Sequence, residues 1–177
     1  TVIDAACLDE KSGNFLCSVY LDSQNAGVAF CDLSTGETHA TSFSGKDRVE
    51  HIVNELGRFS PAEAVVNDGA YSEERLCAVL RERFNCRVEN GGEGRFLAGE
   101  AERSIRAQFG DAGWESLPAG NPAAAMALGG LLKYLYETQK TDLSHINRLD
   151  YYEQGRFMEL DLAARRNLEL TETLRAK

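Results

Sequence analysis

The chain has 177 residues, of which 43% are hydrophobic and 27% are charged, the composition of an ordinary soluble globular protein. Its 28 acidic and 19 basic side chains give a formal net charge of −9 at pH 7. Non-specific DNA binding depends on basic side chains that neutralise phosphates, so this charge argues against a strong DNA-binding surface. The sequence has neither the apolar run of about 18 residues that a membrane span needs nor a signal-peptide pattern, so we expect a cytoplasmic protein that contacts no membrane.

Three strand patterns follow one another in the first part of the chain. Residues 14–22 and 26–33 are continuous apolar runs of strand length, and residues 37–43 are Thr-rich and compatible with a strand. The short connection at 34–36 ends in Gly36, which can adopt a positive φ. This pattern predicts a three-stranded meander.

Two helix–strand units come next. The predicted elements are a helix at 46–56, a strand at 64–67, a helix at 73–84 and a strand at 86–89. Gly57 stands where a helix-ending residue is expected, and Ser72 is suited to cap the second helix. The order β-β-β-α-β-α-β predicts an α/β fold with a ribonuclease H-like mixed sheet and helices packed on it.

The pattern becomes more helical after the fifth strand. A helix rich in charge is predicted at 96–109, and Asn121 and Pro122 then open an apolar helix. Gly129 and Gly130 lie in the middle of that helix, where each costs about 1 kcal/mol relative to alanine. We therefore expect another backbone to approach the helix closely at these two positions.

The sequence divides most naturally at the irregular stretch between these two helices. We predict a ribonuclease H-like domain over 1–110, a linker over 111–120, and, over 121–177, helices that begin an all-α domain. The helix at 122–139 is expected to leave the compact domain. A helix at 161–174 is expected to be poorly buried, because too little chain surrounds it to form a core.

Carboxylates are the first candidates for chemistry, because a ribonuclease H-like nuclease holds two metal ions about 4 Å apart on clustered acids. One such acid lies at the centre of the first strand, where this chain has Leu-Cys-Ser-Val-Tyr at residues 16–20. Asp22, Asp32 and Asp68 lie at strand ends, where we expect solvated turn carboxylates. We predict no catalytic residue.

Cofactor and metal sites are equally unsupported by the sequence. The Gly-rich loop at 90–94 lacks the Lys-Ser/Thr tail of a phosphate-binding P-loop. His39, His51 and His145 have no metal-ligand spacing among themselves or with the cysteines. We therefore predict no cofactor-binding and no metal-binding residues.

Cysteines and aromatic residues have structural interpretations. The five cysteines are Cys7, Cys17, Cys31, Cys77 and Cys86. Their odd number and the absence of a C-x-x-C pair favour free buried thiols in a reducing cytosol. Trp114, Tyr134 and Tyr136 are predicted to pack in a core or between domains, and the Arg165–Arg166 pair to lie on a solvated or interdomain face.

The last part of the chain carries the clearest family resemblance. Residues 160–170 read Leu-Asp-x-Ala-x-Arg-Arg-Asn-Leu-Glu-Leu, with Asp161 as a preferred helix cap. This stretch resembles the opening of the core domain of the MutS family of DNA mismatch-recognition ATPases. No helix stop signal follows, and Leu168, Leu170 and Leu174 still need a partner, so we expect the chain to be part of a longer protein.

Three earlier stretches resemble the same family in the same order. Residues 8–16 are similar to the start of its connector domain, residues 32–37 to the second hairpin of that domain, and residues 125–146 to the start of its core domain. The chain departs from the usual family pattern at Gly13, Phe15 and Ser144, and the last two are small differences.

The resemblance implies a structural and regulatory role. The chain is expected to be a non-catalytic connector that links the mismatch-binding and ATPase ends of a longer protein and docks a MutL-type partner. Mismatched DNA, ATP and Mg are expected to bind other parts of that protein, which the resemblance makes a homodimer. The alternative is a stand-alone metal-dependent nuclease of ribonuclease H-like fold.

Overall fold

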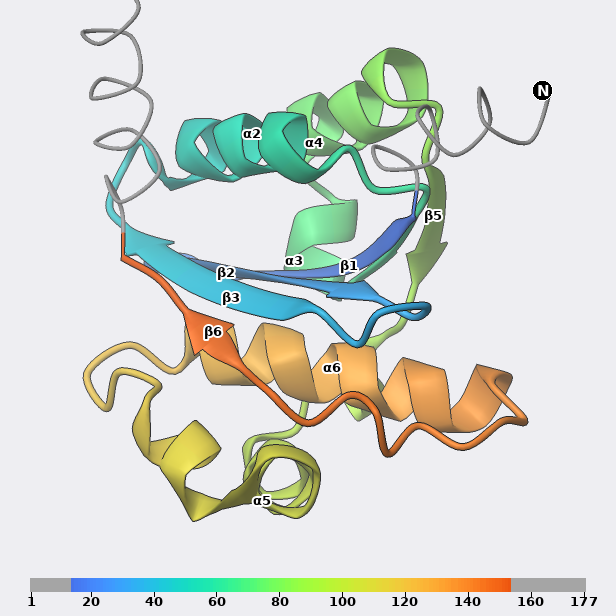
Figure 1. Ribbon diagram of the computed structural model, residues 1–177. Helices are drawn as coiled ribbons and strands as arrows, with labels where there is room; N and C mark the ends of the chain where they lie inside the picture. The colour runs from blue at the N-terminus through green and yellow to red at the C-terminus, as the bar shows by residue number, and fades with distance from the viewer. Residues whose placement is uncertain (1–13, 154–177) are drawn as a thin grey trace, which may run out of the picture.

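A mixed sheet of six strands forms the middle layer of the structure, a computed structural model that describes residues 14–153. The strand order is β5-β4-β1-β2-β3-β6. Helices α2 and α4 cover one face of this sheet, whereas α6 covers the other face and separates it from α5 (Figure 1). The described chain therefore has two cores, one on each face of the sheet.

The strands confirm the predicted ribonuclease H-like arrangement. They are β1 (Phe15–Leu21), β2 (Asn25–Asp32), β3 (Thr38–Ser44), β4 (Glu63–Val66), β5 (Arg87–Asn90) and β6 (Asp150–Tyr151). The first three form the predicted antiparallel meander, and β4 and β5 add to β1 in parallel. Gly36, at the turn between β2 and β3, has the expected positive φ, +81°. The sequence analysis missed β6, which pairs in parallel with the outer edge of β3 through only two residues.

The helical elements differ more from prediction than the strands do. They are α2 (Arg48–Phe59), α3 (Asp68–Tyr71), α4 (Glu74–Ala78), the π-helical turn η1 (Val79–Arg83), the 3-10 turn η2 (Glu93–Arg95), α5 (Ala98–Glu115) and α6 (Ala123–Thr138). The helix that we predicted at 73–84 is thus α4 continued by a π-helical turn.

Two predicted helix boundaries are wrong for identifiable reasons. Gly57 does not end α2, because the helix continues to Phe59, whose ring stacks on Phe30 in the core, and Ser60 ends it in the left-handed conformation. Ser72 does not cap the start of α4, where Glu73 takes the N-cap position, and instead ends α3. The buried Asn67 caps the start of α3, accepting the Ala70 N–H at 3.0 Å and holding the end of β1.

The predicted linker and the predicted course of the apolar helix are also wrong. Within 111–120, the chain remains helical to Glu115, after a kink at Gly110. Helix α6 does not leave the compact domain but lies against β1, β2 and β3. Residues 123–151, which we assigned to the separate stretch 121–177, therefore belong to the layers around the sheet. The predicted helix at 161–174 lies outside the described residues.

Small side chains explain why α6 packs so closely on the sheet. Gly27 of β2 faces the start of α6, and a Cβ at this position would overlap the main chain of Ala123 and Ala124. A Cβ at Gly129, on the opposite side of α6, would overlap Ala101 of α5. The predicted close approach of another backbone is thus confirmed at Gly129, whereas Gly130 faces the ring of Phe96. Helix α6 is held tightly from both sides.

Gly27 gives the first testable prediction. Gly27→Ala should lower the free energy of unfolding by about 1–3 kcal/mol, because the added methyl group has no space between β2 and α6. The measurement is urea denaturation followed by circular dichroism.

Gly57→Ala is the matched control, because Gly57 is exposed in α2 and a Cβ there meets nothing within 4 Å. It should raise the free energy of unfolding by about 0.5–1 kcal/mol, since alanine favours helix more than glycine does. Equal effects of the two substitutions would contradict the close packing of α6.

Candidate functional site

Within residues 14–153, the carboxylates that a nuclease would need do not cluster. Asp22 accepts backbone N–H groups of Gln24 and Asn25 at 2.9 and 2.7 Å, and Asp32 accepts the Ser34 N–H at 2.9 Å. Burial raises the pKa of Asp22, but the two backbone donors, the Tyr20 hydroxyl and the nearby Arg48 charge together outweigh that effect and the pKa is lowered. Asp22 and Asp32 both accept hydrogen bonds within their own turns, as predicted, but Asp32 is buried instead of solvated, and Asp68 is exposed at the start of α3.

Metal ligands do not converge within residues 14–153, where no three His, Cys, Asp or Glu side chains are placed to hold an ion. The three histidines lie apart and have different surroundings. His51 stacks on Phe43 with ring centroids 5.1 Å apart, and His145 places Nε2 2.5 Å from the Leu33 carbonyl oxygen. His39 lies between two carboxylates.

The four described cysteines, Cys17, Cys31, Cys77 and Cys86, are free and buried, as predicted, whereas Cys7 lies outside the described part of the chain. Burial raises the pKa of Cys31 to about 11 and that of Cys86 to about 12. A thiol acts as a nucleophile through its thiolate, which these environments disfavour. These side chains therefore act as small apolar residues of the core.

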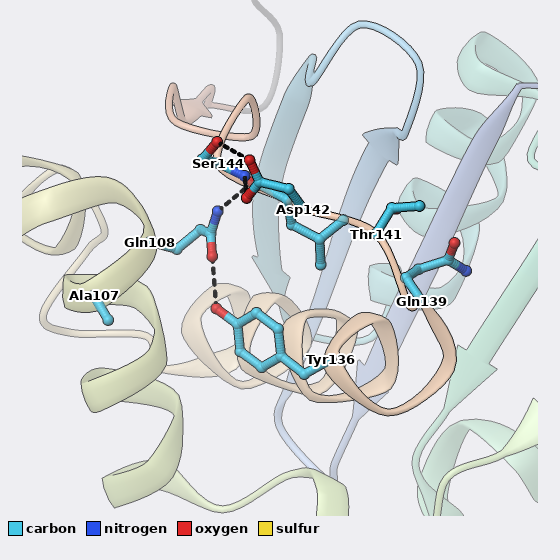
Figure 2. A pocket seen from close by; sticks show the side chains of 8 residues that line it. Ala107, Gln108, Tyr136, Gln139, Thr141, Asp142 and Ser144 are labelled. Atoms are coloured by element: carbon cyan, nitrogen blue, oxygen red, sulfur yellow. Dashed lines mark hydrogen bonds between the residues drawn. The ribbon is translucent and has the colours of Figure 1, made fainter.

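A hollow of about 590 Å³ lies where α5, α6 and the segment after α6 meet. Figure 2 shows that Gln108 and Tyr136 point toward each other, as do Asp142 and Ser144, whereas Thr141 and Gln139 point away. Tyr136 donates to Gln108 at 2.7 Å, and Gln108 donates to the carbonyls of Leu143 and Ile146 at 2.9 and 2.6 Å. The Gln108 amide is thus occupied in fixing the 141–146 segment, and we assign it a structural role.

Aromatic residues of the helical layer only partly follow the prediction. Tyr134 is buried; it donates to Glu63 of β4, and the Arg95 guanidinium lies 5.2 Å from its ring centroid. Trp114 is half-buried below the Arg106 guanidinium. Tyr136 is 46% exposed, contrary to the predicted packing role, because it lies on the rim of the hollow. Arg165 and Arg166 lie outside the described residues.

His39 occupies the most unusual charged environment of the described chain. Its Nδ1 lies 2.8 Å from an Asp150 carboxylate oxygen, and its Nε2 lies 2.7 Å from a Glu37 carboxylate oxygen. The ring also lies among aromatic side chains, with the Phe59 centroid at 5.2 Å and the Tyr152 centroid at 6.3 Å. We call this arrangement the His39 cage.

The cage forms where the last described strand joins the sheet. Tyr152 donates its hydroxyl to Glu55 of α2 at 2.7 Å and its N–H to the Ala40 carbonyl at 3.0 Å. The Tyr151 and Ser42 hydroxyls are 3.0 Å apart. Residues 150–152, which we call the β6 strap, are therefore tied to both β3 and α2. No periodic signal of a two-residue strand exists in a sequence, so this site was missed.

An exposed tyrosine–arginine pair lies on the side of the fold opposite α5. Tyr71, at the end of α3, is 43% exposed, and the Arg81 guanidinium of η1 lies 5.7 Å from its ring centroid. Arg81 is itself exposed. Tyrosine and arginine are enriched among the residues that dominate binding at protein interfaces. This pair is therefore a candidate contact for a partner protein.

The family model of MutS domain II matches residues 14–147. The chain belongs to the MutS family. The DNA mismatch repair protein MutS of Acetivibrio thermocellus is 39% identical to it over 178 residues, which cover 100% of this chain and 20% of that protein. The MutS proteins of Clostridium novyi and Ruminiclostridium cellulolyticum are 37% and 36% identical, again across 100% of this chain, and it covers 19% and 20% of them.

These matches confirm the identification as a fragment of a MutS connector. The chain spans about 20% of the length of the relatives it matches. The domain II match runs from β1 through both α5 and α6, the same elements that pack around the sheet. Within residues 14–153 of this chain, no helix is long and apolar enough to cross a membrane.

Thiol labelling tests the assignment of the cysteines. Cys17, Cys31, Cys77 and Cys86 should react with iodoacetamide at about pH 8 at least about 100-fold more slowly than free cysteine, because each is buried and has a raised pKa. Peptide mass spectrometry would assign each site, and labelling in urea is the control in which all four should react. Rapid labelling of any of the four in the native state would show that its burial is wrong.

Proposed function

We propose that this chain is the connector of a MutS-type mismatch-repair ATPase, and that it links a mismatch-binding part to an ATPase part and docks a MutL-type partner. The observation that carries the proposal is the match to MutS domain II over residues 14–147. The longer protein would bind mismatched DNA, ATP and Mg through other parts, act as a homodimer and work in the cytoplasm. This chain would contribute no catalytic residue.

The packing supports a linking role. The sheet is covered on both faces, α6 is held between the sheet and α5, and Tyr134 joins α6 to β4. Close-packed interiors have low compressibility and transmit displacement instead of absorbing it. The described part would therefore move as one body between the parts of a longer protein.

The Tyr71–Arg81 pair is our choice for the partner contact. A guanidinium that lies over an aromatic ring keeps its N–H donors at its edge, where they suit a partner carboxylate. DNA is the less suitable partner for the chain as a whole, because its net charge of −9 opposes phosphate. We expect only weak, salt-sensitive DNA binding and no ATP hydrolysis by this chain.

Binding to the N-terminal domain of a MutL protein tests the docking proposal. The chain should bind with a Kd on the order of micromolar, because association entropy offsets much of the contact energy. Tyr71→Ala and Arg81→Ala should each weaken binding by about 2 kcal/mol, or about 30-fold, if the pair is central to the contact. Isothermal titration calorimetry measures both values.

Arg103→Ala is the matched control, because Arg103 is also an exposed arginine but lies on α5, beyond the other face of the sheet (Figure 1). It should leave the Kd within about twofold. A truncation at residue 110 would be a poor control, since it would remove α6 and uncover the apolar face of the sheet. If the unsubstituted chain does not bind, docking is refuted. If all variants bind equally well, only the assignment of the contact to the Tyr71–Arg81 pair is refuted. Mg-dependent DNA cleavage would support the nuclease alternative instead.

A further inference from the structure

We infer that Asn90 is a site of spontaneous deamidation whose rate is set by the pairing of β5 with β4. Asn90 and Gly91 form the only Asn-Gly pair in the sequence. Glycine has no side chain to hinder the approach of its backbone nitrogen to the preceding side chain, so ring closure is easiest at this pair. The inference goes beyond the proposed function, because it assigns a covalent modification to the Gly-rich loop that follows β5.

The reaction needs only water. The Gly91 backbone nitrogen gives up its proton and attacks the side-chain carbonyl carbon of Asn90. The new C–N bond closes a five-membered succinimide ring, the bond to the side-chain nitrogen breaks, and ammonia leaves with the proton. Water then opens the ring at either carbonyl and yields aspartate or isoaspartate. Both products carry a negative charge that asparagine lacks.

The fold holds both reacting groups in place. The Gly91 N–H donates to the Val66 carbonyl at 2.8 Å, at the end of the ladder between β5 and β4. The Asn90 side-chain oxygen accepts the Gly92 N–H at 2.9 Å. Asn90 itself is exposed, so water can reach it. Ring closure therefore requires that the Gly91 N–H first leaves Val66, which is a local opening of β5.

Strand β5 is suited to such opening because it lies at the edge of the described sheet. Within that sheet it pairs only with β4, through four residue pairs. Val88 is its apolar contact with the core on the α2 side, and this side chain is only partly buried. Local opening of a weakly held element takes less free energy than global unfolding. The pairing of one short edge strand thus controls the reaction.

Packing explains why glycine follows Asn90 and what the modification would change. A Cβ at Gly91 would lie 2.8 Å from the Arg95 side chain and 2.9 Å from the Val65 side chain. A larger residue, which would slow ring closure, therefore fits poorly. Isoaspartate adds one carbon to the main chain and displaces Gly91 against these neighbours. The isoaspartate form then loses the bond between Gly91 and Val66.

Incubation at mildly alkaline pH followed by peptide mass spectrometry measures the rate. The native chain should deamidate at Asn90 at least about tenfold more slowly than the chain unfolded in guanidinium chloride, because only the opened fraction reacts. Equal rates in the two states would overturn control by β5. Absence of reaction at Asn90 in the unfolded chain would overturn the assignment of the site.

Two variants separate local opening of β5 from global unfolding. Val88→Ala removes an apolar contact of β5 but keeps the Asn-Gly pair, so it should speed native deamidation about three- to tenfold. Val49→Ala is the matched control, because Val49 of α2 is also partly buried against the same core. It should leave the rate within about twofold. Equal acceleration by both variants would show that global unfolding controls the reaction and would overturn the inference.

Hydrogen exchange of the Gly91 amide gives an independent measure, because the same N–H must be released for exchange and for ring closure. Its protection factor should agree within about threefold with the ratio of the unfolded to the native deamidation rate. A strongly protected Gly91 amide together with fast native deamidation would refute control by the ladder. None of these measurements involves a MutL protein or DNA, so their failure would leave the proposed function untouched.

Discussion

The close approach of α6 to the sheet is the constraint on which the rest of the structure depends. It requires Gly27 on β2, since any side chain there would overlap the first turn of α6. Once α6 is seated, Ala101 of α5 can approach Gly129 on its outer side. Packing densities in such an interior leave no room for an added methyl group. The packing of α6 on the sheet, and of α5 on α6, therefore depends on Gly27.

The chain that follows α6 returns to the sheet through a series of polar contacts. Gln108 first fixes the carbonyls of Leu143 and Ile146. His145 then meets Leu33 at the end of β2, where Gly36 leaves room for the His145 carbonyl. The strap finally pairs with β3 and bonds to α2. These contacts carry the chain across the α6 side of the molecule to the opposite core, so they join the two cores that the sheet separates.

The two most distinctive polar features of this MutS-family chain are the His39 cage and the exposed Tyr71–Arg81 pair. Neither lies at the β1 position where nucleases of this fold carry an acid. The centre of β1 is the buried Ser18, and the nearest acids at strand ends serve as acceptors within their own turns. By contrast, the His39 cage joins elements far apart in the sequence, and the Tyr71–Arg81 pair is an exposed contact between nearby elements.

The sequence by itself determined the meander, the two helix–strand units, the free cysteines and the family, because each depends on local periodicity, turn residues or a linear motif. Only the tertiary structure decided where α6 lies, since an apolar helix has the same pattern whether it packs on its own sheet or on another domain. It also decided the end of α2, where burial of Phe59 overrides the exposed Gly57. The β6 strap and the His39 cage could be found only from the tertiary structure. They join His39, which also contacts Glu37, to Asp150, and no local pattern encodes a contact between residues 111 positions apart.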